Sequence, residues 1–331
     1  MSLRSSLALL SFACLTALPL TATDIVWPTS LDRASIRSPE DYLQPTVSGR
    51  LESATFGMVR EDGKRFHEGV DIRPAASNAD GEPLDLALAA MDGQVAYLNP
   101  HVNGPYGKYV VLFHAGAEIP VYTLYAHLAK LEPSLKVGAN VPRGRPIGLM
   151  GHTSAGATPI TKDRSHLHFE VGLILSTGFN LWYAAQPENK QSANLHGLYN
   201  GQNLIGMDPL PLLGRTKVDI LAALRSQPTA LTVSLRAGKT PDFVKRYPAL
   251  VRGDAARAAG WYVEFSWQGM PIRWTALDAA SPQLPATRWR LQEIDQSQRT
   301  RLIQRKMLGP DGRTPGELLT QNVEILLSTA R

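Results

Sequence analysis

Short runs of alternating apolar and polar residues dominate the first two thirds of the chain, and Gly, Pro and Asn separate them. Runs of this kind, rich in β-branched and aromatic residues, are typical of β-strands. The spacing predicts strands at residues 94–98, 109–113, 121–125 and 166–171. Between residues 178 and 206 the composition changes to Asn, Gln and aromatic side chains, which predicts a long loop leaving the sheet. Loops of that length inside a compact domain are commonly functional.

The last third of the chain mixes the two patterns. Residues 217–225 have apolar positions at helical spacing, residues 231–235 and 261–267 alternate like strands, and 318–330 could close the chain as a helix. We therefore expect a mainly antiparallel β domain at residues 51–214, followed by a small α+β C-terminal domain at 215–331. Residues 23–50 are polar and contain three prolines, which predicts a lead-in or linker.

The first 22 residues have the pattern of a secretory signal peptide. Arg4 gives a positive start, residues 7–20 are mostly apolar, and small residues follow at 21–23. The apolar run is shorter than the roughly 20 residues that a membrane-spanning helix needs, so we expect an exported protein, periplasmic or secreted, with no transmembrane segment. The alternative of a lipoprotein anchored at Cys14 is weaker, because Ser11 stands where that motif normally has Leu. Cys14 is the only cysteine, so the mature protein would contain no disulfide.

The charges are divided unevenly along the chain. All 331 residues together hold 34 Lys and Arg against 29 Asp and Glu, but residues 1–214 sum to −3 and residues 215–331 to +8. A basic unit favours anionic partners such as nucleic acid, a membrane surface or an acidic polymer. Export argues against nucleic acid. The arginines of the C-terminal unit either contact carboxylate-bearing glycan strands or form a solvated face, and the sequence leaves both open.

Three short segments concentrate residues that bind metals and transfer protons: His67-Glu-Gly-Val-Asp71, Tyr125-Ala-His127-Leu128 and His166-Leu-His168-Phe-Glu170. Residues two apart in a strand share a face, so the third segment should place two imidazoles and a carboxylate side by side. Such groups are costly to bury without partners, which predicts a metal or a wet cleft there. Glu170 either orients a metal ligand or faces solvent.

Together the three segments resemble the zinc endopeptidases of the LytM/lysostaphin type, peptidase family M23. The family pattern is His-x-x-x-Asp, Tyr-x-His-Leu and His-Leu-His-Phe-Glu in that order, and all three are intact. The resemblance extends over about residues 51–213, including Phe56-Gly-Met-Val-Arg60. It implies a barrel-sandwich-like antiparallel sheet. The chain departs from the family in the long, charged segment 158–165 and in the insertion at 178–206. Both segments could form walls of the substrate groove.

The resemblance also implies the roles of the site residues. His67, Asp71 and His168 would bind Zn²⁺, with the fourth position open to a water that the metal activates. His166 is best placed as general base for that water. His127 would stabilise the oxyanion or donate a proton, and the sequence leaves the division of work between the two histidines open. His101, His114, His152 and His196 match no such position and are expected to be surface or packing residues, with His196 in the long loop the nearest to an exception.

The function that follows is an exported zinc metalloendopeptidase that hydrolyses stem or bridge peptides of bacterial peptidoglycan. The alternative is a non-catalytic LytM-like cell-wall binder or regulator of other hydrolases, in which metal ligands are typically replaced; here all three are present. Residues 137–144 also resemble the hairpins of lipoyl and biotinyl carriers, but the lysine of the modification motif is missing.

Overall fold

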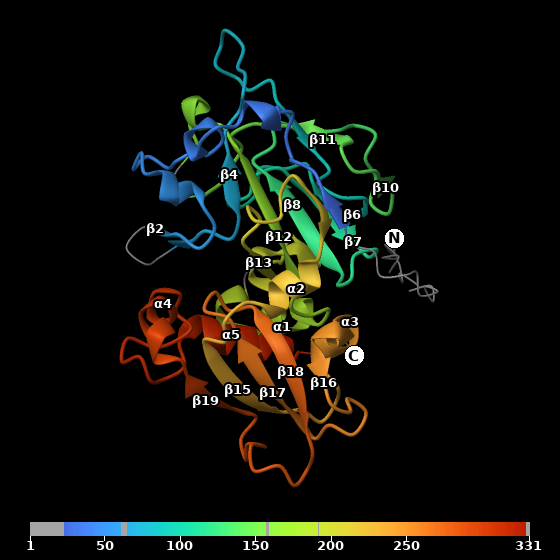
Figure 1. Ribbon diagram of the computed structural model, residues 1–331, viewed down its shortest axis with the longest axis vertical. Helices are drawn as coiled ribbons and strands as arrows, with labels where there is room; N and C mark the ends of the chain where they lie inside the picture. The colour runs from blue at the N-terminus through green and yellow to red at the C-terminus, as the bar shows by residue number, and fades with distance from the viewer. Residues whose placement is uncertain (1–22, 61–64, 157–158, 191, 329–331) are drawn as a thin grey trace, which may run out of the picture.

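The structure is a computed structural model that describes residues 23–60, 65–156, 159–190 and 192–328. The predicted signal peptide, which includes Cys14, lies outside the described residues. Figure 1 shows two parts: an upper one built mostly of strands, and a lower one in which helices lie over a second sheet. Within the described ranges no helix is long and apolar enough to cross a membrane.

The upper part is organised around a seven-stranded antiparallel sheet. Its strands run in the order β10, β6, β7, β8, β12 and β13, and β4 pairs with β12 beside β13. All four predicted strands are confirmed in this sheet. The bounds are β4 Val70–Ile72, β6 Gly93–Asn99, β7 Tyr109–His114, β8 Val121–Ala126, β10 Asn140–Val141, β12 Leu167–Ile174 and β13 Leu204–Met207.

Strand β12 is an interior strand near one end of this sheet. It pairs with β8 along one edge, and with β4 and then β13 along the other. Its alternate residues Leu167, Phe169 and Val171 are fully buried in the apolar core. Alternation then requires His168 and Glu170 to lie on the opposite face, as the sequence pattern predicts.

Smaller sheets complete the upper part. A three-stranded sheet has the order β5 (Leu86–Leu88), β11 (Pro146–Leu149) and β9 (Lys130–Leu131). Strands β2 (Val59–Arg60) and β3 (Arg65–Phe66) pair just before the first histidine of the site. Ile25 and Leu43, in the stretch expected as a lead-in, are buried in the core, and β1 (Thr23–Ile25) pairs with β14 (Arg215–Val218).

The insertion at 178–206 differs from the predicted loop. It begins with helix α1 (Phe179–Ala185), continues through short 3₁₀ turns and returns as β13. The prediction failed because polar residues separate these elements and because β13 is defined by pairing with β12, a contact that no local pattern reveals.

The lower part is α+β, in agreement with the sequence. Its sheet has the order β16, β18, β17, β15 and β19, with β16 parallel to β18 and the other pairs antiparallel. The strands are β15 Leu231–Arg236, β16 Val251–Arg252, β17 Gly260–Phe265, β18 Pro271–Leu277 and β19 Trp289–Ile294. The helices are α2 Ile220–Arg225, α3 Asp242–Arg246, α4 Arg299–Gln304 and α5 Glu317–Leu326.

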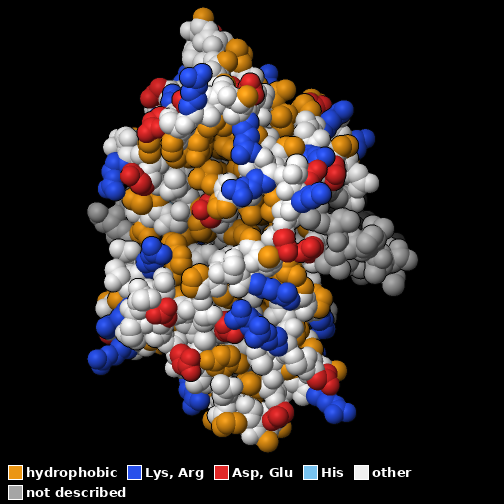
Figure 2. Space-filling view, viewed as in Figure 1, with side chains coloured by type: hydrophobic (Ala, Val, Ile, Leu, Met, Phe, Trp, Pro, Cys, Tyr) orange, Lys and Arg blue, Asp and Glu red, His pale blue; other side chains and the backbone are white. Residues whose placement is uncertain are grey.

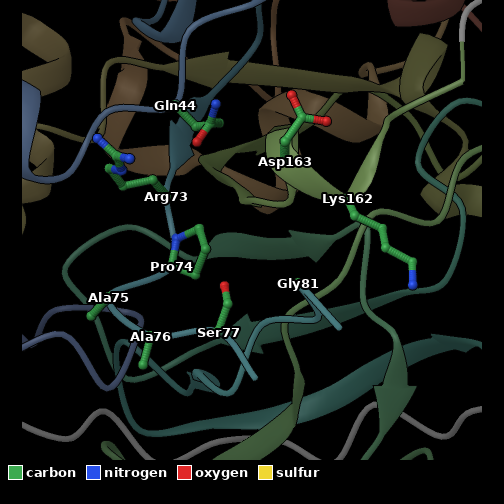
Figure 3. A pocket seen from close by; sticks show the side chains of 9 residues that line it. All are labelled: Gln44, Arg73, Pro74, Ala75, Ala76, Ser77, Gly81, Lys162 and Asp163. Carbon is green, nitrogen blue, oxygen red and sulfur yellow. The ribbon is translucent and has the colours of Figure 1, made fainter. Parts of the chain in front are cut away.

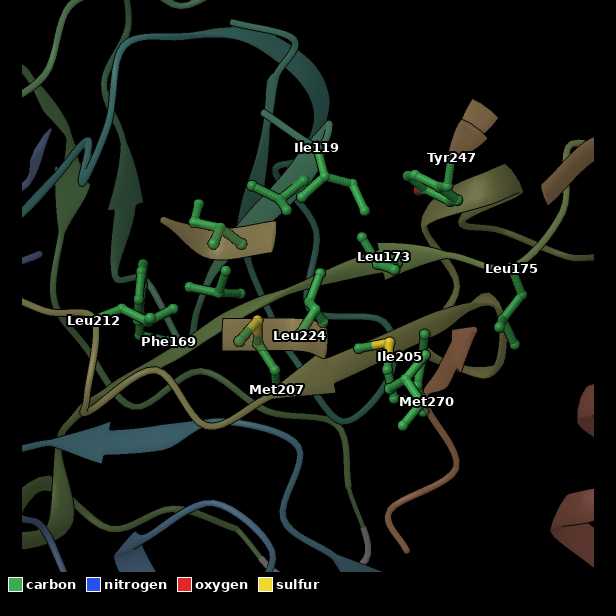
Figure 4. Close-up of a cluster of buried hydrophobic side chains, with 14 of the residues drawn as sticks. Ile119, Phe169, Leu173, Leu175, Ile205, Met207, Leu212, Leu224, Tyr247 and Met270 are labelled. Atoms are coloured by element: carbon green, nitrogen blue, oxygen red, sulfur yellow. The ribbon is translucent and has the colours of Figure 1, made fainter. Parts of the chain in front are cut away.

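The two parts share one apolar core. Figure 4 shows Leu173, Ile205 and Met207 of the upper sheet lying near Leu224, Tyr247 and Met270 of the lower part, and all six belong to a single buried cluster. The Tyr247 hydroxyl also accepts a hydrogen bond of 2.9 Å from the Ile174 backbone N–H. The lower part is therefore packed against the sheet that carries the candidate site.

Candidate metal centre

The first segment of the site is a turn that enters a strand. His67 and Gly69 precede β4, and Asp71 lies within it, opposite His168 of β12. A Cβ on Gly69 would lie 2.3 Å from the Phe169 carbonyl oxygen, so only glycine permits this close approach of the two strands. The His67 Nδ1–H donates to the Thr55 carbonyl oxygen at 2.8 Å, which leaves Nε2 of His67 with a free lone pair.

A hydrogen bond also fixes the ring of His168, in this case through its Nε2 atom. Its Nε2 lies 2.9 Å from Glu170 Oε1, and Glu170 also accepts hydrogen bonds from the Tyr106 and Tyr122 hydroxyls at 2.6 and 2.8 Å. Glu170 is fully buried, so the solvent-facing alternative is wrong, and its contact with His168 agrees with the orienting alternative. With its Nε2–H held by Glu170, His168 turns Nδ1 toward Asp71, and a deprotonated Nδ1 would offer its lone pair to a metal.

Three ligand atoms converge between these strands. His67 Nε2 lies 2.9 Å from Asp71 Oδ1 and 3.1 Å from His168 Nδ1, and the last two atoms are 3.0 Å apart. In a tetrahedral zinc site with bonds of about 2.0–2.1 Å, ligand atoms lie about 3.3 Å apart. Two ring nitrogens and a carboxylate oxygen are turned toward one point. The donor set therefore fits a divalent cation such as zinc, and these three residues are the group that could hold one.

The remaining two histidines stand beside this triangle. The Nδ1–H of His166 donates to the Arg164 carbonyl oxygen at 2.7 Å, and that of His127 to the Thr153 carbonyl oxygen at 2.8 Å. Their ring centroids are 4.8 Å apart, and His166 Nε2 lies 3.6 Å from Asp71 Oδ1. His127 takes a left-handed backbone conformation with φ 62°. Such strain in a non-glycine residue is common at functional sites.

Burial controls the charge states of the site. The five residues are 3–8% exposed, and burial lowers the pKa of His67 to about 4 and also lowers the pKa of His127 and His166. All three are therefore neutral near pH 7, with Nε2 able to accept a proton. Burial also lowers the pKa of His168, but hydrogen bonds to Asp71 and Glu170 outweigh it and raise the pKa to about 9. Near pH 7 the His168 Nδ1 therefore carries a proton toward Asp71, and a metal would displace this proton on binding.

Asp71 has a partner that the sequence did not predict. Arg60 Nη2 lies 2.8 Å from Asp71 Oδ2 and also donates to the Ser53 carbonyl oxygen. Because Arg60 occupies Oδ2, Asp71 is left to present Oδ1 to the metal position. The position of Arg60 in the Phe56-Gly-Met-Val-Arg60 stretch was the only signal in the sequence. No signal in the sequence indicated the contacts of Tyr106 and Tyr122 with Glu170, because both tyrosines come from distant parts of the chain.

A pocket of about 560 Å³ is lined in part by residues that follow β4 and by residues of the segment before His166. Figure 3 shows Arg73, Lys162 and Asp163 around it; Arg73 directly follows β4, and the other two come from the charged segment before His166. Lys162 pairs with Glu82 at 2.8 Å, which ties this segment to the loop after β4. His196, by contrast, lies 3.3 Å from the Tyr97 hydroxyl and packs on Tyr109.

Residues 65–177 match the model of peptidase family M23, and the chain matches none of the curated proteins compared with it. Three solved structures have similar regions. A protein of Ruminococcus gnavus ATCC 29149, proposed to be a glycyl-glycine endopeptidase LytM, is 22% identical over 57% of this chain and 59% of its own, with a TM-score of 0.34. The match thus spans less than two thirds of that protein.

The second is the catalytic domain of the antimicrobial peptidase lysostaphin from Staphylococcus simulans, at 18% identity over 48% of this chain and 86% of its own, with a TM-score of 0.30. The third is a zinc-containing peptidase from Vibrio cholerae, at 26% identity over 46% of this chain and 37% of its own, with a TM-score of 0.28. The family match, over 113 of the 331 residues, and the intact motifs together make residues 65–177 similar to peptidase family M23.

Proposed function

We propose that this chain is an exported zinc metalloendopeptidase that hydrolyses peptide bonds in bacterial peptidoglycan. The observation that carries the proposal is the convergence of His67 Nε2, Asp71 Oδ1 and His168 Nδ1 within 3.1 Å of one another. A non-catalytic cell-wall binder has no need of this complete ligand set. The family match supports a peptidase, and the predicted signal peptide supports export.

The residues of the chain divide the work as follows. His67, Asp71 and His168 would hold Zn²⁺, which supplies an acidified water and polarises the scissile carbonyl. His166, neutral and held through its Nδ1–H, would take the proton of the attacking water at Nε2. His127, held in the same manner by Thr153, would offer its Nε2 to the developing oxyanion or to the leaving amine. Glu170 and Arg60 would keep His168 and Asp71 in place.

The experiment that tests this function is digestion of purified sacculi by the zinc-loaded chain, with and without a chelator, followed by mass spectrometry of the released muropeptides. We expect soluble fragments whose new ends identify the hydrolysed bond, and we expect the chelator to stop their release and added zinc to restore it. Binding to sacculi without release of fragments, from a chain shown to contain zinc, would instead favour the non-catalytic alternative.

A further inference from the structure

A second pocket, of about 810 Å³, lies where the upper part meets the lower, C-terminal part. We propose that it is an anion-binding subsite that holds a carboxylate of an extended peptide substrate, an inference that rests on the proposed function. The pocket is lined by residues from the lead-in, from the stretch before His67 and from the region of α4: Thr46, Ser48, Arg50, Ser53, Met58, Val59, Arg60, Ile303, Gln304 and Lys306. All of them lie outside the 65–177 segment that matches the family.

The charged side chains that line the pocket are all positive. Arg50, Arg60 and Lys306 bring three cationic groups, and Thr46, Ser48 and Ser53 bring hydroxyls, while the described lining contains no Asp or Glu. Guanidinium and ammonium groups together with hydroxyls are the donors that recognise carboxylates. An anion in this pocket would therefore meet several donors at once.

Arg60 is already paired with buried Asp71, but the other two cations pair with carboxylates only at the surface. Glu52 lies 3.8 Å from Arg50, and Glu317 lies 3.1 Å from Lys306. The side chains of both pairs are at least half exposed, and exposed pairs contribute little. Arg50 and Lys306 are thus free to turn toward a ligand.

Arg60 connects this pocket to the metal centre. It lines the pocket and at the same time contacts Oδ2 of Asp71 at 2.8 Å. One side chain therefore separates the pocket from a residue that would bind zinc. A peptide whose scissile bond lies at the metal position could place a neighbouring carboxylate in the pocket.

Lys306 has a backbone conformation that favours glycine. Its φ is 60°, and it follows the C-terminus of α4, a position where glycine is the usual residue. A lysine there is strained, yet it is the residue that brings its ammonium group to the pocket. Strain of this kind at a pocket wall agrees with a binding role.

The C-terminal wall is held against the peptidase part by ring contacts. The Arg305 guanidinium lies 3.6 Å from the centre of the Phe66 ring, and Trp267 packs on the same ring with centroids 5.7 Å apart. Phe66 directly precedes His67. The pocket and the metal centre therefore share a rigid support, which suits an extended substrate that must reach both.

The test measures binding by the full chain in the His166→Ala background, so that no hydrolysis occurs. The probes are a fluorescently labelled stem tetrapeptide with free carboxylates and the same peptide with every carboxylate amidated. The test variant is Lys306→Gly, which removes the ammonium group and relieves the backbone strain. Its matched control is Lys217→Gly, because Lys217 is also an exposed lysine with a left-handed backbone, φ 53°, and lies in β14 away from the pocket.

We expect the parent to bind the free peptide about three- to tenfold more tightly than the amidated one, with the preference decreasing as salt increases. Lys306→Gly should lose most of this preference without a lower melting temperature, while Lys217→Gly keeps it. Equal binding of the two peptides by the parent, or a preference unchanged in Lys306→Gly, would overturn the subsite. The parent without His166→Ala is assayed on sacculi in parallel: absence of hydrolysis there, with the carboxylate preference intact, would reject the proposed function and not the pocket.

Discussion

The chemistry of the site depends on where single protons are held. Thr55 holds the proton of His67 on Nδ1, and Glu170 accepts that of His168 Nε2, so the other two ring nitrogens face each other across 3.1 Å. The resemblance of three sequence motifs to peptidase family M23 implied His67, Asp71 and His168 as metal ligands. The sequence could not predict the contact of Arg60 with Asp71 or those of Tyr106 and Tyr122 with Glu170, because tertiary packing determines all three.

The role of Glu170 is testable by removing its charge. Glu170→Gln keeps the shape but weakens the hold on the His168 Nε2–H, and loss of such a supporting hydrogen bond typically lowers metal affinity about 10- to 100-fold. We expect a zinc dissociation constant at least about tenfold higher, measured by competition with a chelating dye. The control is Glu188→Gln, an exposed position. Unchanged zinc affinity in Glu170→Gln would show that Glu170 is a packing residue only.

His114 gives a prediction on pH that does not involve the metal. It is buried between the Asp92 carbonyl oxygen and the Thr123 hydroxyl, and burial lowers its pKa from 6.5 to about 4. Because the unfolded chain takes up a proton on this histidine and the folded chain does not, stability should fall as pH drops from 6.5 toward 4. Urea unfolding at pH 7.5 and 4.5, in chelator, should show His114→Gln losing about 2 kcal/mol less on acidification than the wild type. Equal losses would contradict the assignment.

At the scale of elements, the site depends on strands β4 and β12 lying side by side. Alternation in the sequence predicted β12 and the face that its histidines share. The pairing of β12 with β4 and β13 was not predictable, since three- and four-residue strands carry too little pattern and are selected by tertiary contacts. The same reason explains why α1 and β13 were expected as loop.

A substitution at Gly69 tests the close approach of β4 and β12. In Gly69→Ala the new Cβ would lie 2.3 Å from the Phe169 carbonyl oxygen, so β4 must move away from β12. We expect about 2 kcal/mol lower stability to chemical denaturation together with weaker zinc binding, because Asp71 moves with β4. The control is Gly116→Ala, where an added Cβ meets nothing within 4 Å. Similar behaviour of the two variants would show that the strands tolerate more space than the structure indicates.

At the scale of the whole molecule, the C-terminal domain is part of the structure that holds the site. The sequence predicted a basic α+β unit but not its packing on the core of the upper part. The reason is that apolar residues at an interface have the same pattern as those inside an isolated domain. In the view of Figure 2, Lys and Arg side chains lie over both parts with acidic side chains among them. The C-terminal excess of positive charge is therefore not gathered into one patch on this face.

This packing predicts the outcome of removing the domain. A chain ending at Gly214 would expose Leu173, Ile205 and Met207, which now lie in the shared core. We expect it to aggregate or to bind a hydrophobic dye, as measured by size-exclusion chromatography and fluorescence, and to lose zinc affinity because Phe66 loses its cover. A monomeric truncated chain with a cooperative unfolding transition and unchanged zinc affinity would show that the domain is a separate appendage.

The most direct test of the central claim compares His168, which lies in β12, with His166, which directly precedes that strand. Zinc content and release of muropeptides from sacculi are measured for the wild type, His166→Ala and His168→Ala, with circular dichroism as the check on folding. We predict that His166→Ala retains zinc but releases fragments at least about 100-fold more slowly, and that His168→Ala loses both zinc and hydrolysis. Hydrolysis at the wild-type rate by either folded variant would contradict the proposed metal centre and its base.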